Sequence, residues 1–346
     1  MNLNFILSIK TVICLAITLL STPLFASKED IAFNKYADFL SNKLTSQYLP
    51  NTNNAPYIIV AEQLSNNIIM LDANKNWADK NAEIWRWQPE KANGMPVEYA
   101  KWFKFIDECK PIIDTSHIIV TASHGGVAVI RIKDKKVVFF AHAGKNPHSA
   151  CLLPDGNVVA VSSTDNKLTL FDTSKYKQGE PCRDFVCYQL DFAHGVVWDK
   201  QQQMLWGLGM QSIVGYKYNF NKKYPALIRV CSYEVPEVAK CGHDLYPIPN
   251  TKYLFLTGTE GIAIFDTQTR KFRDIANVKH VKSISMSEPN GQVIYLKATT
   301  RWWSQSVVAA NAQLSKIGTY PNGKIYKARW LIPNEFSACD VAPCND

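Results

Sequence analysis

The chain has 346 residues, of which 47% are apolar and 20% charged, so it can bury one large core or two ordinary ones and is neither disordered nor fibrous. Its net charge of +8 is spread along the chain and forms no basic arm, so we expect no nucleic-acid partner.

The first 26 residues have the pattern of a secretory signal peptide. Lys10 is the only charge before an apolar run at 11–20, and the small residue Ala26 precedes a charged segment. The alternative is a retained membrane anchor, but an apolar run of 10 residues is too short to span a bilayer comfortably. We therefore expect cleavage after Ala26, a periplasmic or secreted location, and no stable membrane insertion afterwards.

Residues 27–56 are predicted to form one short helix and a linker. Ile31, Tyr36 and Phe39 approach helical spacing, and Ser27 can cap the start of the helix.

If the protein is exported, its cysteines can form disulfides, because the compartment is oxidising. Three pairs lie close in sequence and no C-x-x-C motif occurs, which favours disulfides over a zinc site. The expected bridges are Cys182–Cys187, Cys231–Cys241 and Cys339–Cys344. Cys109 and Cys151 are left over, and their pairing stays open.

From residue 57 to the end, the apolar runs are short, rich in β-branched residues and separated by turn residues, which is typical of an all-β domain at 57–346. One pattern recurs: a strand, a tight turn, a second strand, and a third strand. The repeats start at Lys110, His148, His194, His243, Lys282 and Lys327. Their spacings of 38, 46, 49, 39 and 45 residues fit the four strands of a propeller blade.

The two ends of this domain carry complementary half-blades. The start at Lys327 has no second strand after it, whereas strands predicted at 57–62, 67–72 and 83–87 have no first strand before them. Joining the halves closes the ring and leaves no long open edge. We therefore predict a six-bladed β-propeller closed by its N- and C-terminal strands, with an irregular β-sandwich as the alternative.

Several phrases of the sequence carry a family resemblance. They are Gly144–Ala150 (GKNPHSA), Ala193–Asp199 (AHGVVWD), Gly242–Leu245 (GHDL), Val281–Ile284 (VKSI) and Tyr326–Trp330 (YKARW). They resemble those of a secreted bacterial propeller family classed as a domain of unknown function. The resemblance covers roughly residues 57 to 333 and implies a six-bladed propeller, but it supplies no activity, so function has to be argued from the site.

The innermost strands of a propeller run along its central channel in one direction, so equivalent strand starts are predicted to form a ring at one mouth. Its predicted members are Lys110, His148, His194, His243, Lys282 and Lys327. Loops that open on the same face bring a second set to the rim. These are Glu62, Gln63, His124, Asp165, Glu260, Arg301, Trp302 and Trp303. If the register is off by one pair, His280 takes the place of Lys282.

Three histidines in consecutive blades predict a facial metal site. Neutral imidazoles of His148, His194 and His243 suit a divalent ion such as Zn²⁺, Mn²⁺, Fe²⁺ or Cu²⁺. The alternative is that each ring only fills the mouth, hydrogen-bonded to the backbone of a neighbouring blade.

The lysines predict an anion site. Lys110, Lys282 and Lys327 repel one another in a narrow mouth unless a phosphate, sulfate or carboxylate lies between them. Arg301 can pair with a carboxylate, and Trp302 can support the face of a sugar. The alternatives are lysines that bend into solvent and a tryptophan that packs between blades.

These residues predict an exported protein that binds an anionic small molecule or glycan with the help of a metal. The second hypothesis is a metal-assisted lyase or hydrolase of acidic polysaccharide, similar in architecture but not in motifs to oligogalacturonate lyases. His124 and Glu260 are its candidate acid or base groups. The third is a protein-interaction scaffold, which would need no polar ring.

Overall fold

The structure is a computed structural model that describes residues 57–287, 291–310 and 315–333. The predicted signal peptide, the predicted helix within 27–56 and the Cys339–Cys344 pair lie outside the described residues.

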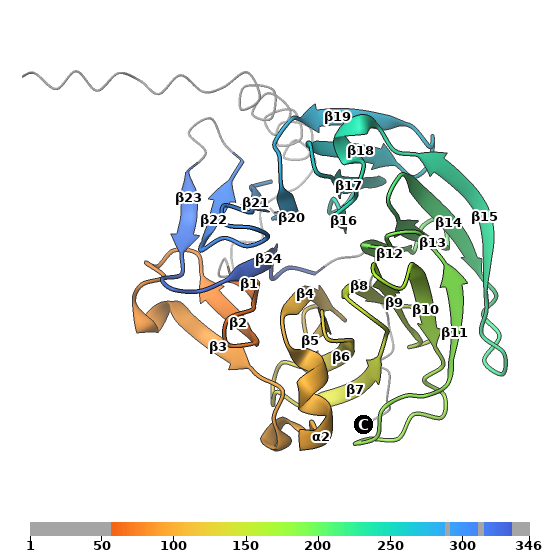
Figure 1. Cartoon of the computed structure of the whole chain (residues 1–346), viewed down its shortest axis with the longest axis horizontal. Helices are drawn as coiled ribbons and strands as arrows, with labels where there is room; N and C mark the ends of the chain where they lie inside the picture. The colour runs from red at the N-terminus through yellow and green to blue at the C-terminus, as the bar shows by residue number, and fades with distance from the viewer. Residues whose placement is uncertain (1–56, 288–290, 311–314, 334–346) are drawn as a thin grey trace, which may run out of the picture.

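Strands in the described part of the chain form six four-stranded antiparallel sheets arranged as a ring (Figure 1). Blade 1 contains β4 (Ile106–Ile112), β5 (His117–Ala122), β6 (Gly126–Arg131) and β7 (Val137–His142). Blade 2 contains β8 (Pro147–Leu152), β9 (Val158–Ser162), β10 (Lys167–Phe171) and β11 (Phe185–Gln189). Blade 3 contains β12 (Gly195–Asp199), β13 (Met204–Leu208), β14 (Ser212–Tyr218) and β15 (Leu227–Glu234).

The other half of the ring includes the blade that closes it. Blade 4 contains β16 (Asp244–Pro247), β17 (Tyr253–Thr257), β18 (Ile262–Asp266) and β19 (Phe272–Ala276). Blade 5 contains β20 (Val281–Met286), β21 (Val293–Lys297), β22 (Ser306–Ala309) and β23 (Lys316–Thr319). Blade 6 joins β24 (Ile325–Trp330) to β1 (Tyr57–Glu62), β2 (Asn67–Asp72) and β3 (Glu83–Trp87).

The predicted closure of the ring is confirmed. Strand β24 pairs antiparallel with β1, with Ile59 opposite Arg329 and Ala61 opposite Lys327. Figure 1 shows the two strands side by side although they come from opposite ends of the chain. The six-bladed propeller predicted from the repeat spacing is therefore the observed fold, and every inner strand faces the central axis.

Burial explains why these sequences form blades. The inner strands are buried on both faces, and one apolar cluster fills each interface between neighbouring blades. Removing a Val, Leu or Ile side chain from water contributes roughly 1.5–3 kcal/mol, so near-continuous apolar inner strands stabilise the ring. The outermost strands β11 and β15 are largely exposed.

Helical structure is minor in the described residues. It consists of α2 (Val97–Ala100) and the short 3₁₀ turns η1 (Lys80–Ala82), η2 (Lys91–Asn93), η3 (Lys101–Phe103) and η4 (Glu237–Ala239). Of the helices in the described ranges, none has the length and apolar character needed to cross a bilayer.

Two expected disulfides are not present among the described residues. Cys187 carries an exposed free thiol, and Cys231 and Cys241 are free as well. Because Cys187 lies in the extended strand β11 opposite Thr169, its side chain is directed by that pairing. Cys182 is held elsewhere, since its Sγ contacts Asp172 O at 3.3 Å. The structure therefore does not show the predicted bridges Cys182–Cys187 and Cys231–Cys241, and they stay predictions.

Candidate functional site

At the mouth of the channel, four of the six inner strands carry a β-bulge. The hydrogen-bond register between the inner strand and the next strand of the blade shifts by one residue at Asp107, at His148, at Lys282 and at Tyr326. Such β-bulges re-aim a side chain and often occur next to functional sites. In blades 3 and 4, His194 and His243 directly precede the inner strand. We call these six residues the mouth ring: Asp107, His148, His194, His243, Lys282 and Tyr326.

Backbone contacts hold the two histidines that precede their strands. The backbone N–H of His194 donates to Leu208 O at 2.9 Å, and that of His243 donates to Thr257 O at 2.7 Å. Gly195 follows His194 and lies against Leu245, so a side chain at this position would clash with blade 4. The sequence His-Gly therefore lets blade 3 pack closely while it places an imidazole at the axis.

The histidines and Lys282 form a continuous row. The rings of His148 and His194 stack with centroids 4.2 Å apart and planes 11° from parallel. The ring of His243 meets His194 edge-on at 5.6 Å. Lys282 Nζ lies 2.9 Å from His243 Nε2 and completes the row.

Hydrogen bonds assign the protons on two of the rings. His194 Nδ1 lies 2.8 Å from the carbonyl oxygen of Phe192, so Nδ1 carries the proton and donates. His243 Nε2 accepts from the Lys282 ammonium, which leaves the proton on Nδ1. That Nδ1 is buried and has no hydrogen-bond partner among the described residues. A buried donor without a partner costs roughly 1–3 kcal/mol, so a ligand that supplies an acceptor there would be stabilised.

Burial disfavours the charged forms of the three histidines and of Lys282. It lowers the pKa of His194 to about 3. Burial, and to a smaller extent the neighbouring ring of His194, lowers the pKa of His148 well below its ordinary value. Burial and the nearby charge of Lys282 lower the pKa of His243 in the same way. Burial, with Lys327 as a like charge, lowers the pKa of Lys282 to about 8. At neutral pH the mouth ring therefore holds three uncharged imidazoles and one lysine that gives up its proton easily.

Asp107 completes the ring as a buried carboxyl group whose charged form is disfavoured by burial. Burial raises its pKa well above the ordinary value, although Ser123 Oγ donates to its Oδ2 at 2.7 Å. Gln63 Nε2 donates to Asp107 Oδ1 at 2.9 Å. His148 lies next to this group, with Nδ1 at 3.8 Å from Asp107 Oδ2 and 3.4 Å from Tyr326 Oη.

Gln63 also connects the ring to the rim. Trp302 Nε1 donates to Gln63 Oε1 at 2.9 Å, and 44% of Trp302 is exposed. The guanidinium of Arg301 lies 5.9 Å from the Trp302 ring centre. An exposed aromatic face therefore stands one hydrogen-bonded side chain away from the mouth ring.

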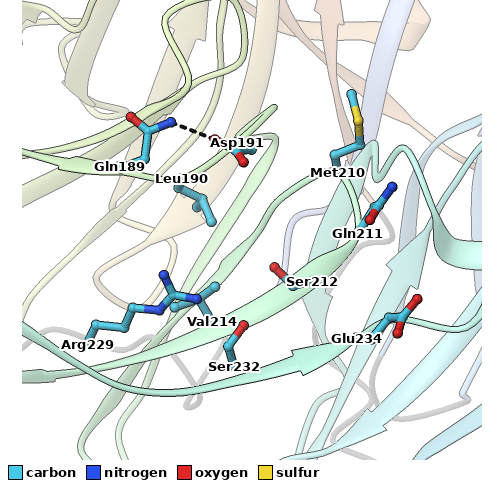
Figure 2. Close-up of a pocket in the computed structure, with 10 residues that line it drawn as sticks. All are labelled: Gln189, Leu190, Asp191, Met210, Gln211, Ser212, Val214, Arg229, Ser232 and Glu234. Atoms are coloured by element: carbon cyan, nitrogen blue, oxygen red, sulfur yellow. Dashed lines mark hydrogen bonds between the residues drawn. The ribbon is translucent and has the colours of Figure 1, made fainter.

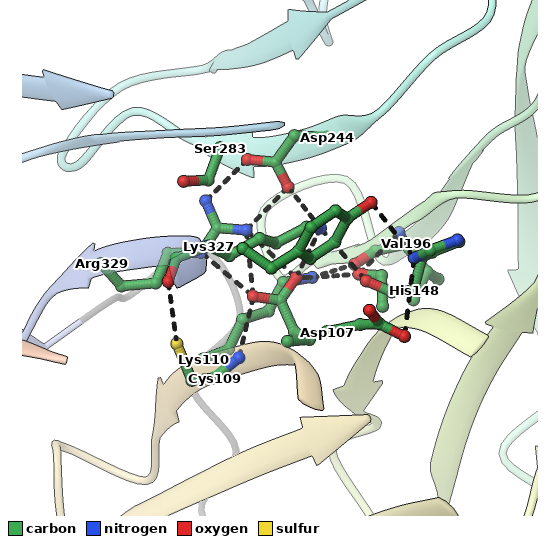
Figure 3. Close-up of polar contacts among 12 residues, drawn as sticks. Asp107, Cys109, Lys110, His148, Val196, Asp244, Ser283, Lys327 and Arg329 are labelled. Atoms are coloured by element: carbon green, nitrogen blue, oxygen red, sulfur yellow. Dashed lines mark hydrogen bonds and ion pairs between the residues drawn. The ribbon is translucent and has the colours of Figure 1, made fainter. Parts of the chain in front are cut away.

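Deeper along the inner strands, five buried charged side chains fill the axis. They are Glu108, Lys110, Asp244, Lys327 and Arg329, here called the axial charge cluster (Figure 3). Arg329 Nη2 lies 3.0 Å from Glu108 Oε1, and its Nη1 lies 2.6 Å from Asp244 Oδ2. Lys327 Nζ contacts the same two carboxylates at 3.1 and 3.0 Å. Since β24 supplies both cations, the cluster ties the closing blade to blades 1 and 4.

The remaining lysine of the cluster is less tightly paired. Lys110 Nζ donates to Ser149 Oγ at 2.6 Å and to Val196 O at 2.8 Å, but lies 3.8 Å from Glu108. Burial lowers the pKa of Lys110 to about 8. Burial would raise the pKa of Glu108 and of Asp244, but the adjacent cations outweigh it and lower both.

The predicted ring is thus divided between two levels. The members found in the mouth ring are His148, His194, His243 and Lys282. Lys110 and Lys327 lie deeper, and Asp107 and Tyr326 take their places. A one-residue bulge explains why Tyr326 takes the place of Lys327, because an inserted residue changes which side chain faces the mouth. Lys110 lies deeper for another reason, since β4 already begins at Ile106 and Lys110 is its fifth residue.

The three histidines do not form a metal-ligand set in this structure. Lone pairs of imidazole nitrogens lie in the ring plane, so the stacked rings of His148 and His194 do not aim at one common point. Across the described ranges, no group of three or more His, Cys, Asp or Glu side chains could hold a metal ion. Metal binding by this trio stays a prediction that requires at least one ring to rotate.

Other residues predicted at the rim have partners of their own. His124 is exposed, with its ring 5.5 Å from that of Phe105. Glu260 Oε2 lies 2.6 Å from Lys279 Nζ, and both side chains are more than half exposed. His280 is exposed just before β20, so it does not replace Lys282 in the ring.

Sequence reasoning missed Asp107, Glu108, Asp244, Tyr326 and Arg329. A signal for three of them was present, because Glu108, Asp244 and Arg329 are charges inside inner strands that are otherwise buried. A charge in such a strand must find a counter-charge, and only the other inner strands can supply it.

A hollow lies away from the axis, between blades 2 and 3. It has a volume of about 520 Å³ and is lined by the segments 189–191 and 210–212 together with Val214, Arg229, Ser232 and Glu234 (Figure 2). Gln189 Nε2 donates to Asp191 Oδ1 there at 2.6 Å. This groove has polar walls but no cluster of buried titratable groups comparable with the mouth ring.

Fold and site together define a six-bladed β-propeller with a polar axial mouth above a buried charge cluster. The chain belongs to DUF6528, a family of unknown function whose model matches residues 37–342. A comparison with curated proteins finds no match.

Solved structures show similarity in fold alone. A crystal structure of a protein of unknown function from Bacteroides caccae matches 80% of this chain and 99% of its own, with 11% identity and a TM-score of 0.54. Hydrazine synthase from Kuenenia stuttgartiensis matches 63% of this chain and 64% of its own, with 10% identity and a TM-score of 0.42.

Proposed function

We propose that the protein binds an acidic small molecule or acidic glycan unit at the mouth ring. The observation that carries this proposal is an unbalanced charge at the axis. Four cationic side chains, Lys110, Lys282, Lys327 and Arg329, face only two ionised carboxylates, Glu108 and Asp244. Asp107 adds no negative charge, because burial raises its pKa and favours the protonated acid.

Lys282 is the cation best placed for a ligand. Lys327 and Arg329 are fully buried against carboxylates, whereas 8% of Lys282 remains exposed at the mouth. Its Nζ contacts the neutral ring of His243, and no carboxylate of the described residues lies within ion-pair distance of it. An anion beside Lys282 would supply the missing counter-charge and could accept from the unpartnered Nδ1 of His243.

Trp302 extends the site towards a ligand with a flat face. It is close to half exposed and is anchored through Gln63 to Asp107. A sugar acid bound with its carboxylate at Lys282 has an aromatic surface at the rim on which its ring can stack.

Titration calorimetry with D-galacturonate and the neutral sugar D-galactose tests this function. We expect galacturonate to bind at least about 10-fold more tightly, a difference of about 1.4 kcal/mol. Lys282→Met should remove that preference, whereas Lys200→Met, at an exposed turn at the far end of β12, should keep it. Equal affinity for both sugars, or an acid preference that survives Lys282→Met, would contradict the proposal.

The two other hypotheses stay predictions. His124 and Glu260 are exposed and have separate neighbours, so no contact among the described residues supports an acid and base pair for polysaccharide cleavage. A scaffold function would not depend on Lys282, and the same variant distinguishes it from ligand binding.

A further inference from the structure

We infer that Lys282 is a nucleophile that captures the carbonyl group of an oxo acid as an imine, with His243 holding its side chain at the mouth ring. The chemical class of ligand is a small molecule with an aldehyde or ketone close to a carboxylate. Because this reaction uses the mouth ring, it rests on the proposed function and narrows its ligand.

The environment of Lys282 differs from that of the other axial lysines. Lys327 Nζ contacts two buried carboxylates, which stabilise its charged form. Lys110 Nζ is 3.8 Å from Glu108 and is held by two oxygen acceptors. Lys282 Nζ instead contacts an imidazole nitrogen at 2.9 Å. Unlike a carboxylate, an uncharged imidazole supplies no counter-charge that would stabilise the ammonium form.

Position and access favour attack by Lys282. The bulge between Val281 and Ser283 takes Lys282 out of the regular ladder and into the mouth ring. Its small exposed fraction lets a small molecule reach it while most of the side chain is out of water. Burial together with a nearby cation is one of the ways proteins make a lysine amine nucleophilic.

The protonation equilibrium supports this role. With a pKa of about 8, about a quarter of the Lys282 amines are neutral at pH 7.5, against about one in a thousand for an ordinary lysine. The free-amine fraction therefore favours Lys282 by on the order of 100-fold.

The reaction balances without any oxidant or reductant. The Lys282 ammonium first loses a proton to solvent water, and the free amine attacks the carbonyl carbon. A proton moves from the nitrogen to the carbonyl oxygen, which gives a carbinolamine. The carbinolamine hydroxyl takes a proton from solvent and leaves as water, and the nitrogen lone pair forms the C=N bond. The products are one protonated imine and one water.

Reductive trapping on the full chain tests the inference. The protein is treated at pH 7.5 with glyoxylate and sodium cyanoborohydride, which fixes an imine as a stable secondary amine, and labelled lysines are located by peptide mapping. We expect Lys282 to be labelled at least about 10-fold faster than the exposed Lys200, a conservative bound on the difference in free-amine fraction.

Three variants separate chemistry from folding. Lys282→Met and Lys282→Arg should both lose the fast label, and Lys282→Arg should still bind galacturonate because it keeps the positive charge. His243→Asn should shift the pH at which labelling reaches half its maximum, which a purely structural role would not do. Labelling of Lys282 no faster than Lys200 would overturn the inference.

A matched neutral probe, propanal, separates this inference from the proposed function. Faster labelling by glyoxylate than by propanal supports both. Equal labelling of Lys282 by the two probes supports the nucleophile but contradicts an anion site. Galacturonate binding that depends on Lys282, without any fast label, overturns the nucleophile and leaves the proposed function standing.

Discussion

The mouth ring and the axial charge cluster both lie along the inner strands, yet burial shifts the pKa values of their side chains with opposite results. In the axial charge cluster, burial is offset by direct ion pairs, so Glu108 and Asp244 stay ionised against Arg329. In the mouth ring, burial has no such compensation, so it shifts the pKa of His194 and Lys282 towards the neutral forms. The cluster therefore pairs its charges across blades 1, 4 and 6, whereas the mouth ring holds groups without a counter-charge, which is the basis of the ligand site proposed above.

The largest expected effect is the loss of the axial ion pairs. Arg329→Leu should lower the free energy of unfolding by about 3–5 kcal/mol, because it leaves two buried carboxylates with Lys327 and the more distant Lys110 as their remaining counter-charges. Urea denaturation measures the change. Arg131→Leu, which removes a pair with Asp134 near the surface, should cost no more than about 1 kcal/mol. If both variants lost a similar free energy of unfolding, the axial ion pairs would be no more important for stability than a pair near the surface.

The mouth ring should make stability depend on pH. The folded-state pKa of His194 is about 3, below its ordinary value near 6.5, so the unfolded chain binds more protons as the pH falls. Stability is therefore lost between about pH 6.5 and pH 3. His194→Asn should reduce that loss by about 2 kcal/mol between pH 6.5 and 5, since one pKa unit corresponds to about 1.4 kcal/mol.

Urea denaturation across this pH range measures the free energy of unfolding of the wild type and of His194→Asn. His280→Asn, at an exposed position, is the matched control substitution. Identical pH dependence for His194→Asn and the wild type would show that His194 is not held neutral by the fold.

Asp107 should respond with the opposite sign. Its pKa is raised by burial, so folding at neutral pH requires the uptake of a proton and the wild type loses stability as the pH rises above about 4. Asp107→Asn is already neutral and can keep both hydrogen bonds, with Gln63 as donor and Ser123 Oγ as acceptor. We expect a gain of about 1 kcal/mol at pH 7 that disappears near pH 4. A loss of stability at pH 7 would contradict a protonated Asp107.

The smallest effect is expected at the rim. Glu260→Gln removes an exposed ion pair with Lys279, so the free energy of unfolding should change by less than about 0.5 kcal/mol. Labelling of Lys282 by glyoxylate should also stay unchanged. A slower label would bring Glu260 into the function of the mouth, as the polysaccharide-cleaving hypothesis requires.

The repeats in the sequence were sufficient to predict the fold. Inner strands, turn residues and complementary half-blades are local patterns, because each blade is a meander of neighbouring segments. The pairing of Ile59 with Arg329 joins distant residues, but it followed from the count of missing strands and from the cost of an open edge. The local patterns also identified His148, His194, His243 and Lys282 as residues at the mouth.

Tertiary structure alone decided which neighbours those residues have. A bulge of one residue put Tyr326 in place of Lys327 at the mouth, and the start of β4 at Ile106 put Asp107 there in place of Lys110. Bulges leave no clear mark in a single sequence. The pairing of Glu108 with Arg329 joins blades at opposite ends of the chain. The sequence by itself determined the propeller and the supply of charged and imidazole groups. The tertiary structure determined which charged side chains form ion pairs and which have no counter-charge, because desolvation and ion pairing depend on distances of a few ångströms.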